Sequence, residues 1–468
     1  MVFASLEFLT LFLPLFLIGY ALARPTYRNG VLLFSSWIFY GWWSPAFLLL
    51  FIGLTLVGWV GGLAIAAYDK TSLRGWMLSL FICINLLLLC WYKYVNILVE
   101  SFGNSWLVSG TPSSEWQRVV LPIGLSFIVL QSVSYLIDVY RRTVTADRNL
   151  ISFGAYQSMF VHLIAGPIIR YDWVKRELHH RPFDWVNFSL GARRFMVGMC
   201  MKVLIADTLA PVADAVFLLE HPSFADAWAG CIAYGFQLFF DFAGYSAMAI
   251  GLGMMLGFRF PENFNNPYIA TSIQDFWRRW HLSLSSWLRD YLYIPLGGNR
   301  RGNVRTYINL LLTMSIAGLW HGGDSWNFLL WGIAHGIALC VDRVWSRFGM
   351  PDLPVLLTRT ATLIFVFLAW TVFRAHTFDA ALNMYSGQFG LQGYLPSETL
   401  AVLLRPAHWL ALTLGVVSIL APWIYAKIQY RLPERVLMTA GLWPVFGFLL
   451  AYSLIASRGA VPFLYFQF

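Results

Sequence analysis

Long apolar blocks with few charges dominate this sequence and constrain its fold more than any other feature. Of its 468 residues, 59% are hydrophobic and 12% are charged, whereas soluble domains are roughly 25% charged. A bilayer span takes about 20 apolar residues, and by that measure roughly 11 to 13 segments could cross or enter a membrane. Backbone groups inside a bilayer must be satisfied internally, which favours helices. We therefore expect an all-α, polytopic integral membrane bundle, with residues 1–468 forming one domain.

The positive charge of the chain lies mainly in short segments between the apolar blocks. The net charge is +9, which in a soluble protein would suggest a nucleic-acid partner. Here the positive-inside rule explains it better, so we expect membrane lipids and no nucleic acid around the chain. On this basis residues 171–194 and 427–435 are predicted cytoplasmic loops. Residues 101–117 and 375–404 are predicted loops on the opposite side.

Cysteine usage and missing motifs exclude several kinds of chemistry. All five cysteines lie within apolar segments and none forms a CxxC pair, so neither disulfides nor a zinc site is expected. The adjacent His179 and His180 have no spaced partner ligands, and we predict no metal. The sequence contains no P-loop, no GxGxxG opening a βαβ unit, no HExxH and no GxSxG.

One apolar block carries a stripe of polar side chains. Tyr234, Gln237, Asp241 and Tyr245 recur every three or four residues, which places them on one helix face. A carboxylate among phenylalanines needs a partner or a shifted pKa. For Asp241 a structural hydrogen-bonding role and a role on a substrate path are both open.

The stretch between residues 258 and 335 is the part that a simple membrane scaffold does not explain. Residues 273–291 have apolar side chains at helical spacing and are predicted to form one amphipathic helix at the cytoplasmic surface. His281 falls toward its apolar side, and Arg278 and Arg279 toward its polar side. These arginines either meet phosphates of a nucleotide-like donor such as coenzyme A or supply positive-inside charge.

His321 closes the next apolar segment. Residues 309–320 are predicted to form a span that stops at Gly322 and Gly323, since glycine commonly follows a helix end. Imidazole at membrane depth is costly, which makes His321 a functional candidate. A histidine there can act as general base, taking the proton of a hydroxyl that attacks a thioester carbonyl.

Sequence elements from end to end resemble the membrane-bound O-acyltransferases, and within them the bacterial alginate O-acetyltransferase branch. The matching stretches are LPIGLSF (121–127), SYLIDVYR (134–141), HLIAGPIIR (162–170), FDFAGYSAMAIGLG (240–253), FRFPENFNNPY (258–268), FWRRWHLSLSSWLRDYLYIPLGGNR (276–300), GLWHG (318–322) and PFLYFQF (462–468).

The resemblance implies a helical fold around a central cavity, with acetyl-CoA as the cytoplasmic donor and no metal. It implies that acetyl groups cross the bacterial inner membrane to periplasmic acetyl-transfer proteins, which modify an exopolysaccharide. His321 corresponds to the presumed catalytic histidine and His281 to a second functional histidine. Asp241 and Tyr245 then become candidates for lining the cavity.

Two departures from that branch leave the polymer open. FDF continues with Ala-Gly-Tyr-Ser-Ala at residues 243–247 instead of Ser-Gly-Tyr-Ser-Asp, and residues 323–327 are atypical. Alginate and bacterial cellulose are equally credible. The alternative function is a transporter or flippase without acyl-transfer chemistry, which would predict paired broken helices in topologically repeated positions.

Overall fold

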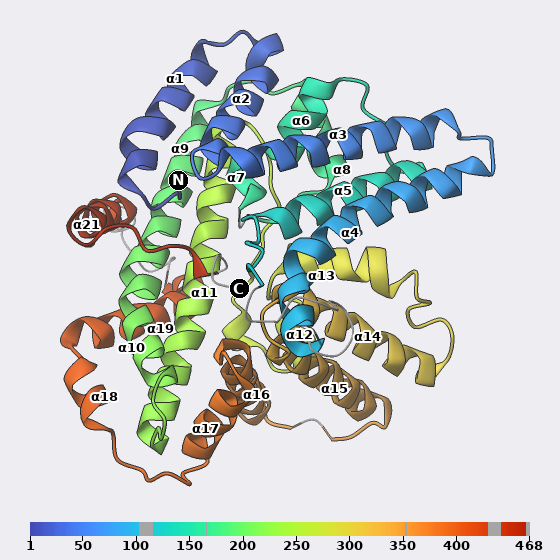
Figure 1. Cartoon of the computed structure of the whole chain (residues 1–468). Coiled ribbons are helices and arrows are strands. Elements are labelled where there is room, and N and C mark those ends of the chain that lie inside the picture. The colour runs from blue at the N-terminus through green and yellow to red at the C-terminus, as the bar shows by residue number, and fades with distance from the viewer. Residues whose placement is uncertain (103–115, 165, 352, 429–440, 465–468) are drawn as a thin grey trace. The chain divides into compact units, whose positions relative to one another are not determined.

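The described part of the chain is helical in this computed structural model, which covers residues 1–102, 116–164, 166–351, 353–428 and 441–464 (Figure 1). No β-strand occurs within those ranges. The chain divides into two compact units. Among the described residues, the first contains residues 1–195 and 248–261, and the second contains residues 196–247 and 262–464. The all-α prediction is confirmed.

Six helical segments are long and apolar enough to cross a bilayer, counted over the described residues. They are Pro45–Ala67, Leu73–Ser101, Trp185–Phe217, Phe224–Met255, Asn327–Arg347 and Val355–Arg374. Two shorter apolar helical segments are Phe8–Leu22 and Pro406–Pro422. The chain is a multi-pass membrane protein.

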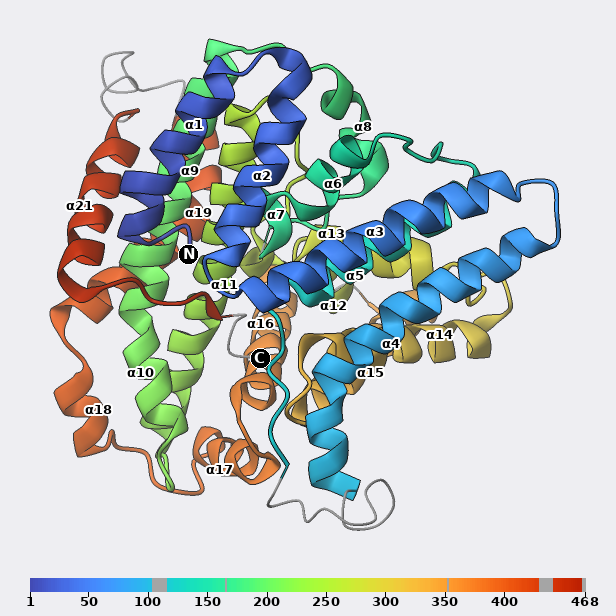
Figure 2. The ribbon, with the colours of Figure 1, turned by 45° about the horizontal axis from the view of Figure 1, so that its top comes forward.

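The first unit contains most of the helices from the N-terminal half. Its elements are η1 (Phe8–Phe12), α1 (Leu13–Leu22), η2 (Pro25–Tyr27), α2 (Arg28–Gly41), α3 (Pro45–Ala67), α4 (Leu73–Phe102), α5 (Leu125–Arg141), α6 (Leu150–Ser158), α7 (Phe160–Leu163) and α8 (Tyr171–His179). Figure 2 shows α3 and α4 running side by side, with α5 against them. Gly61 and Gly62 of α3 permit this packing, because a Cβ there would lie within 3 Å of Leu136 and Tyr135 of α5.

The second unit carries the remaining helices. They are η5 (Met201–Ala206), α10 (Asp207–Phe217), η6 (Pro267–Ile269), α12 (Ile273–Trp277), α13 (Leu282–Leu288), η7 (Arg289–Tyr293), α14 (Asn303–His321), α15 (Asn327–Arg347), α16 (Val355–Arg374), α17 (Phe378–Gln388), α18 (Glu398–Leu403), α19 (Pro406–Ile428) and α21 (Trp443–Arg458). Helices α14 and α15 form a tight hairpin. Gly318 and Gly332 face one another there, and a Cβ on either would strike the opposite backbone.

The boundary between the units falls within α9 (Trp185–Cys200) and α11 (Phe224–Met255). Glycines bring these two helices together in each unit. A Cβ on Gly251 would lie 2.6 Å from the carbonyl oxygen of Gly191 in the first unit, and one on Gly244 would lie 2.7 Å from that of Gly198 in the second. From the first pair to the second, the α9 glycine moves seven residues forward in sequence and the α11 glycine seven residues back. The two helices therefore run antiparallel and contact each other through small residues.

Three sequence-based predictions of local structure are wrong. Residues 171–194 contain α8 and the start of α9, because Asp184 accepts a hydrogen bond from Val186 N at 2.9 Å and starts the helix ten residues before the apolar block. Residues 375–404 contain α17 and α18, whose first turns are capped by Thr377 and Ser397. Residues 273–291 are broken between α12 and α13. Most of the predicted loops 101–117 and 427–435 lies outside the described residues.

Candidate active site

His281 sits at the break that divides the expected amphipathic helix. Its backbone adopts φ +44°, in the left-handed region, so α12 cannot continue into α13. The loop before α12 accepts hydrogen bonds from the first residues of α13, which have no helical partners at this break. Leu282 N donates to the carbonyl of Asn263 at 2.9 Å, and Ser283 Oγ donates to the Asn263 side chain at 2.9 Å. The FRFPENFNNPY loop therefore holds the conformation that presents His281.

The His281 imidazole is fully buried and lies among aromatic rings. Its ring centroid is 4.7 Å from that of Phe242 and 6.2 Å from that of Trp320. Neither ring nitrogen has a hydrogen-bond partner among the described residues. Burial lowers the pKa of His281 to about 3, so the imidazole is neutral at pH 7. Buried polar groups are ordinarily hydrogen-bonded, so the unpartnered imidazole keeps His281 a candidate for the site.

His321 is the last residue of α14, as the sequence predicts. Its side chain is buried, and its ring centroid lies 6.5 Å from that of His281. Gly322 then ends the helix with φ −140°, an ordinary extended conformation. The glycine is needed there for space, because a Cβ would overlap the Phe328 ring.

A third buried histidine, His335 of α15, completes this region. The Trp277 indole N–H donates to its Nδ1 at 3.3 Å. The Trp331 ring lies between the two α14–α15 histidines, with centroids 5.3 Å from His321 and 4.7 Å from His335. The sequence analysis assigns His335 no role, although the helical spacing of Trp331 and His335 was an available signal.

Asp241 is paired with a lysine that sequence reasoning missed. Lys202 Nζ lies 2.8 Å from Asp241 and 2.6 Å from Asp207, and all three side chains are buried. Asp241 also accepts a hydrogen bond from Leu464 N at 2.7 Å. Lys202 lies in η5, a π-helical turn, and such turns are frequent at functional sites. The Asp241 carboxylate on α11 is thus linked to η5 and α10 through Lys202, and to the C-terminal segment through Leu464.

Tyr245 lies one turn after Asp241 and connects it with the histidines through aromatic contacts. The Tyr245 ring is 4.9 Å from that of Phe463, which is 5.9 Å from that of Phe242, the ring against His281. The structure therefore brings His281, His321, Asp241 and Tyr245 into one aromatic-walled region of the second unit.

The two arginines before His281 point elsewhere. Arg278 is exposed. Arg279 Nε lies 2.8 Å from Asp275, one turn earlier, and Nη1 donates to Asn265 O at 3.3 Å. Within the described residues no group of three or more His, Cys, Asp or Glu side chains is placed to hold a metal ion.

Comparison with known proteins decides the family. Residues 72–386 match the model of the membrane-bound O-acyltransferase family, MBOAT. The chain belongs to this family. It is 46% identical to the probable alginate O-acetylase AlgI of Azotobacter vinelandii, over 85% of this chain and 80% of the relative. It is 34% identical to the peptidoglycan O-acetyltransferase of Helicobacter pylori, over 82% of this chain and 79% of the relative.

A more distant membrane-bound O-acyltransferase relative covers about half of the chain. The teichoic acid D-alanyltransferase of Streptococcus thermophilus is 30% identical over 240 residues, which are 48% of this chain and 57% of the relative. The family and these relatives establish the chain as an O-acyltransferase enzyme built from membrane helices.

Proposed function

We propose that this membrane-bound O-acyltransferase passes acetyl groups from cytoplasmic acetyl-CoA across the inner membrane for O-acetylation of an exported exopolysaccharide, alginate or bacterial cellulose. The observation that carries the proposal is the pair of buried histidines His281 and His321 within an enzyme similar to the alginate O-acetylases. Periplasmic acetyl-transfer proteins then receive the group and deliver it to the polymer.

In the proposed reaction His321 is the general base. It takes the proton from the acceptor hydroxyl while that oxygen forms a bond to the acetyl carbonyl carbon. The carbon–sulfur bond of the thioester breaks, and the proton passes from His321 to the departing thiolate of coenzyme A. The atoms balance without a metal or a redox partner.

His281 is proposed to serve the donor side of the same reaction. Its neutral, unpartnered imidazole suits a group that receives or offers a hydrogen bond only when substrate is present. Arg278 and Arg279 are proposed to meet the donor's phosphates, the former through its exposed guanidinium. Asp241 and Tyr245 are proposed to line the path of the acetyl group.

The test is polymer acetylation in cells that make the parent enzyme or His321→Ala at matched membrane levels. We expect acetylation to fall at least about 100-fold, the usual contribution of a general base, while polymer synthesis and export continue. His180→Ala is the matched control, because this histidine is exposed on the first unit, and its acetylation should equal that of the parent.

Two readouts in the same samples identify donor and polymer. Membrane vesicles supplied with acetyl-labelled acetyl-CoA should incorporate label only with an intact His321. Sugar analysis of the acetylated product distinguishes alginate from cellulose. Unchanged acetylation in His321→Ala would mean that His321 only packs the hairpin, and the mechanism would be wrong.

A further inference from the structure

An arginine-lined pocket lies in the first unit, whereas His281, His321 and His335 belong to the second. It has a volume of about 560 Å³ and opens where α3 ends, α4 begins and α5 ends. Arg74, Arg142 and Arg148 line it together with a single acidic residue, Asp69. These four residues leave a net charge of +2, and the volume is that of an ordinary ligand site.

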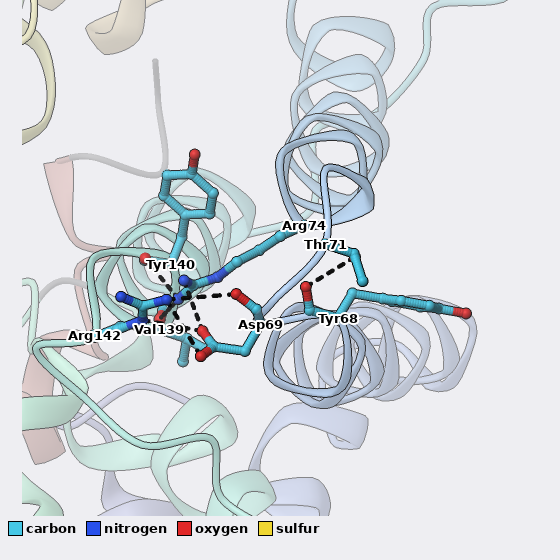
Figure 3. Close-up of polar contacts among 7 residues, drawn as sticks. All are labelled: Tyr68, Asp69, Thr71, Arg74, Val139, Tyr140 and Arg142. Atoms are coloured by element: carbon cyan, nitrogen blue, oxygen red, sulfur yellow. Dashed lines mark hydrogen bonds and ion pairs between the residues drawn. The ribbon is translucent and has the colours of Figure 1, made fainter.

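Two of the arginines are held in place by the protein itself (Figure 3). Arg74 Nη1 lies 2.6 Å from Asp69, and its Nη2 donates to Tyr140 O at 2.8 Å, at the C-terminal end of α5. Arg142 Nε donates to the same carboxylate at 3.0 Å. Both guanidiniums therefore already converge on one anionic group, Asp69. Binding a second anion would cost little further side-chain entropy.

Arg148 supplies a positive charge that no described residue neutralises by direct contact. It is exposed and has no hydrogen bond or ion pair with any described residue. Arg142 is also largely open, with 65% of its side chain exposed. The planar guanidinium of an arginine matches the geometry of a phosphate and can donate two hydrogen bonds to it.

Apart from Thr145, the rest of the pocket wall is apolar, and part of it belongs to a membrane-spanning helix. Leu63, Ala66 and Ala67 come from the last turns of α3, whose mean hydropathy of 2.3 is the highest among the candidate spans. The flanking rings of Tyr68 and Trp76 are 40% and 72% exposed. Exposed aromatic rings at the ends of apolar helices are typical of the headgroup level of a bilayer.

We propose that this pocket binds the phosphate of an anionic phospholipid headgroup, with Arg142 and Arg148 as its main ligands and Arg74 as its fixed floor. The apolar wall receives the start of the acyl chains. A soluble phosphate compound would have the same charge chemistry and no use for that wall, which is why the lipid is favoured. Basic pockets between transmembrane helices bind anionic headgroups in this way.

The experiment uses the full chain purified in a neutral detergent. Retention of added phosphatidylglycerol is measured by native mass spectrometry, with phosphatidylcholine and inorganic phosphate as separate arms. The parent should retain phosphatidylglycerol over phosphatidylcholine, and inorganic phosphate should not displace it. Arg142→Gln/Arg148→Gln should bind on the order of 30-fold more weakly, since each surface arginine contributes about a fivefold factor.

Two further variants keep the proposal falsifiable. Arg148→Gln alone breaks no bond between described residues and should bind about fivefold more weakly with unchanged thermal stability. Arg24→Gln/Arg193→Gln removes the same charge from two exposed arginines of the first unit outside the pocket, and should bind like the parent. Equal retention by all variants would overturn the proposal. Displacement by inorganic phosphate would overturn it in favour of a soluble ligand.

Discussion

At the scale of single residues, His281 combines an unusual backbone conformation with an unusual side-chain environment. A non-glycine residue in the left-handed region is uncommon, although histidine, asparagine and aspartate tolerate it better than most. The fully buried imidazole has no hydrogen-bond partner among the described residues. Features of this kind persist where the surrounding structure enforces them, and here the Asn263 loop does so.

His281 should make the stability of the enzyme sensitive to acid. Its pKa is about 3 in the folded chain and about 6.5 when unfolded, so between these values only the unfolded state binds the proton. The contribution is therefore complete above pH 6.5 and falls by about 1.4 kcal/mol per pH unit below it. We expect the unfolding temperature in detergent to drop between pH 7 and pH 5, and to drop less in His281→Asn.

Asparagine is chosen for this variant because it accepts the positive φ that a β-branched residue would not. An equal drop in His281→Asn and in the parent would mean that other groups cause the acid sensitivity. His162 of α7 is one such group, because burial also lowers its pKa to about 3.

At the scale of the elements, glycines decide how closely the long helices approach. The α9–α11 contacts leave no room for a Cβ at Gly191, Gly244 or Gly251, since the nearest atoms are backbone. Without a hydrophobic driving force between helices in lipid, such close backbone packing is a principal source of association. Regularly spaced small residues thus contribute to helix association here, a role that burial of apolar side chains plays in soluble proteins.

Gly251→Ala should destabilise the enzyme by about 1–3 kcal/mol, the usual cost of overpacking. Its Cβ would lie 2.6 Å from Gly191 O and 2.8 Å from Phe195 N, neither of which can move cheaply. Gly19→Ala in α1 is the matched control, because no atom lies within 4 Å of its Cβ. The control should unfold at or above the parent temperature. If both variants unfold alike, the close α9–α11 contact is not present in the membrane.

At the scale of the whole molecule, one buried charge cluster ties together parts of the chain that are far apart in sequence. Lys202, Asp207 and Asp241 join η5, α10 and α11, and Asp241 reaches Leu464 near the C-terminus. A buried cluster of this kind is weak evidence of added stability, but removing Lys202 deprives two buried carboxylates of the cation that contacts them both. The cluster therefore makes the fold of the second unit depend on Lys202.

Lys202→Met should lower the free energy of unfolding by about 3–5 kcal/mol and reduce the amount of enzyme in the membrane. Asp241→Asn should cost less, because its amide oxygen can still accept from Leu464 N and Lys202 keeps Asp207 at 2.6 Å. Thermal unfolding and membrane levels give this order. Acetylation by Asp241→Asn at matched levels then separates a structural carboxylate, with activity retained, from one that meets substrate.

The sequence alone determined the helical membrane class, the family and the end of α14 at His321, because these depend on local composition, helix-stop residues and contiguous motifs. It also placed Asp241 and Tyr245 on one helix face. It did not reveal the break at His281, since apolar side chains at helical spacing continue through residues 273–291 while the Asn263 loop pairs with the broken backbone. The Lys202 partner of Asp241, 39 residues away, and the arginine pocket of the first unit were decided by tertiary structure, because each depends on contacts between elements that no local pattern records.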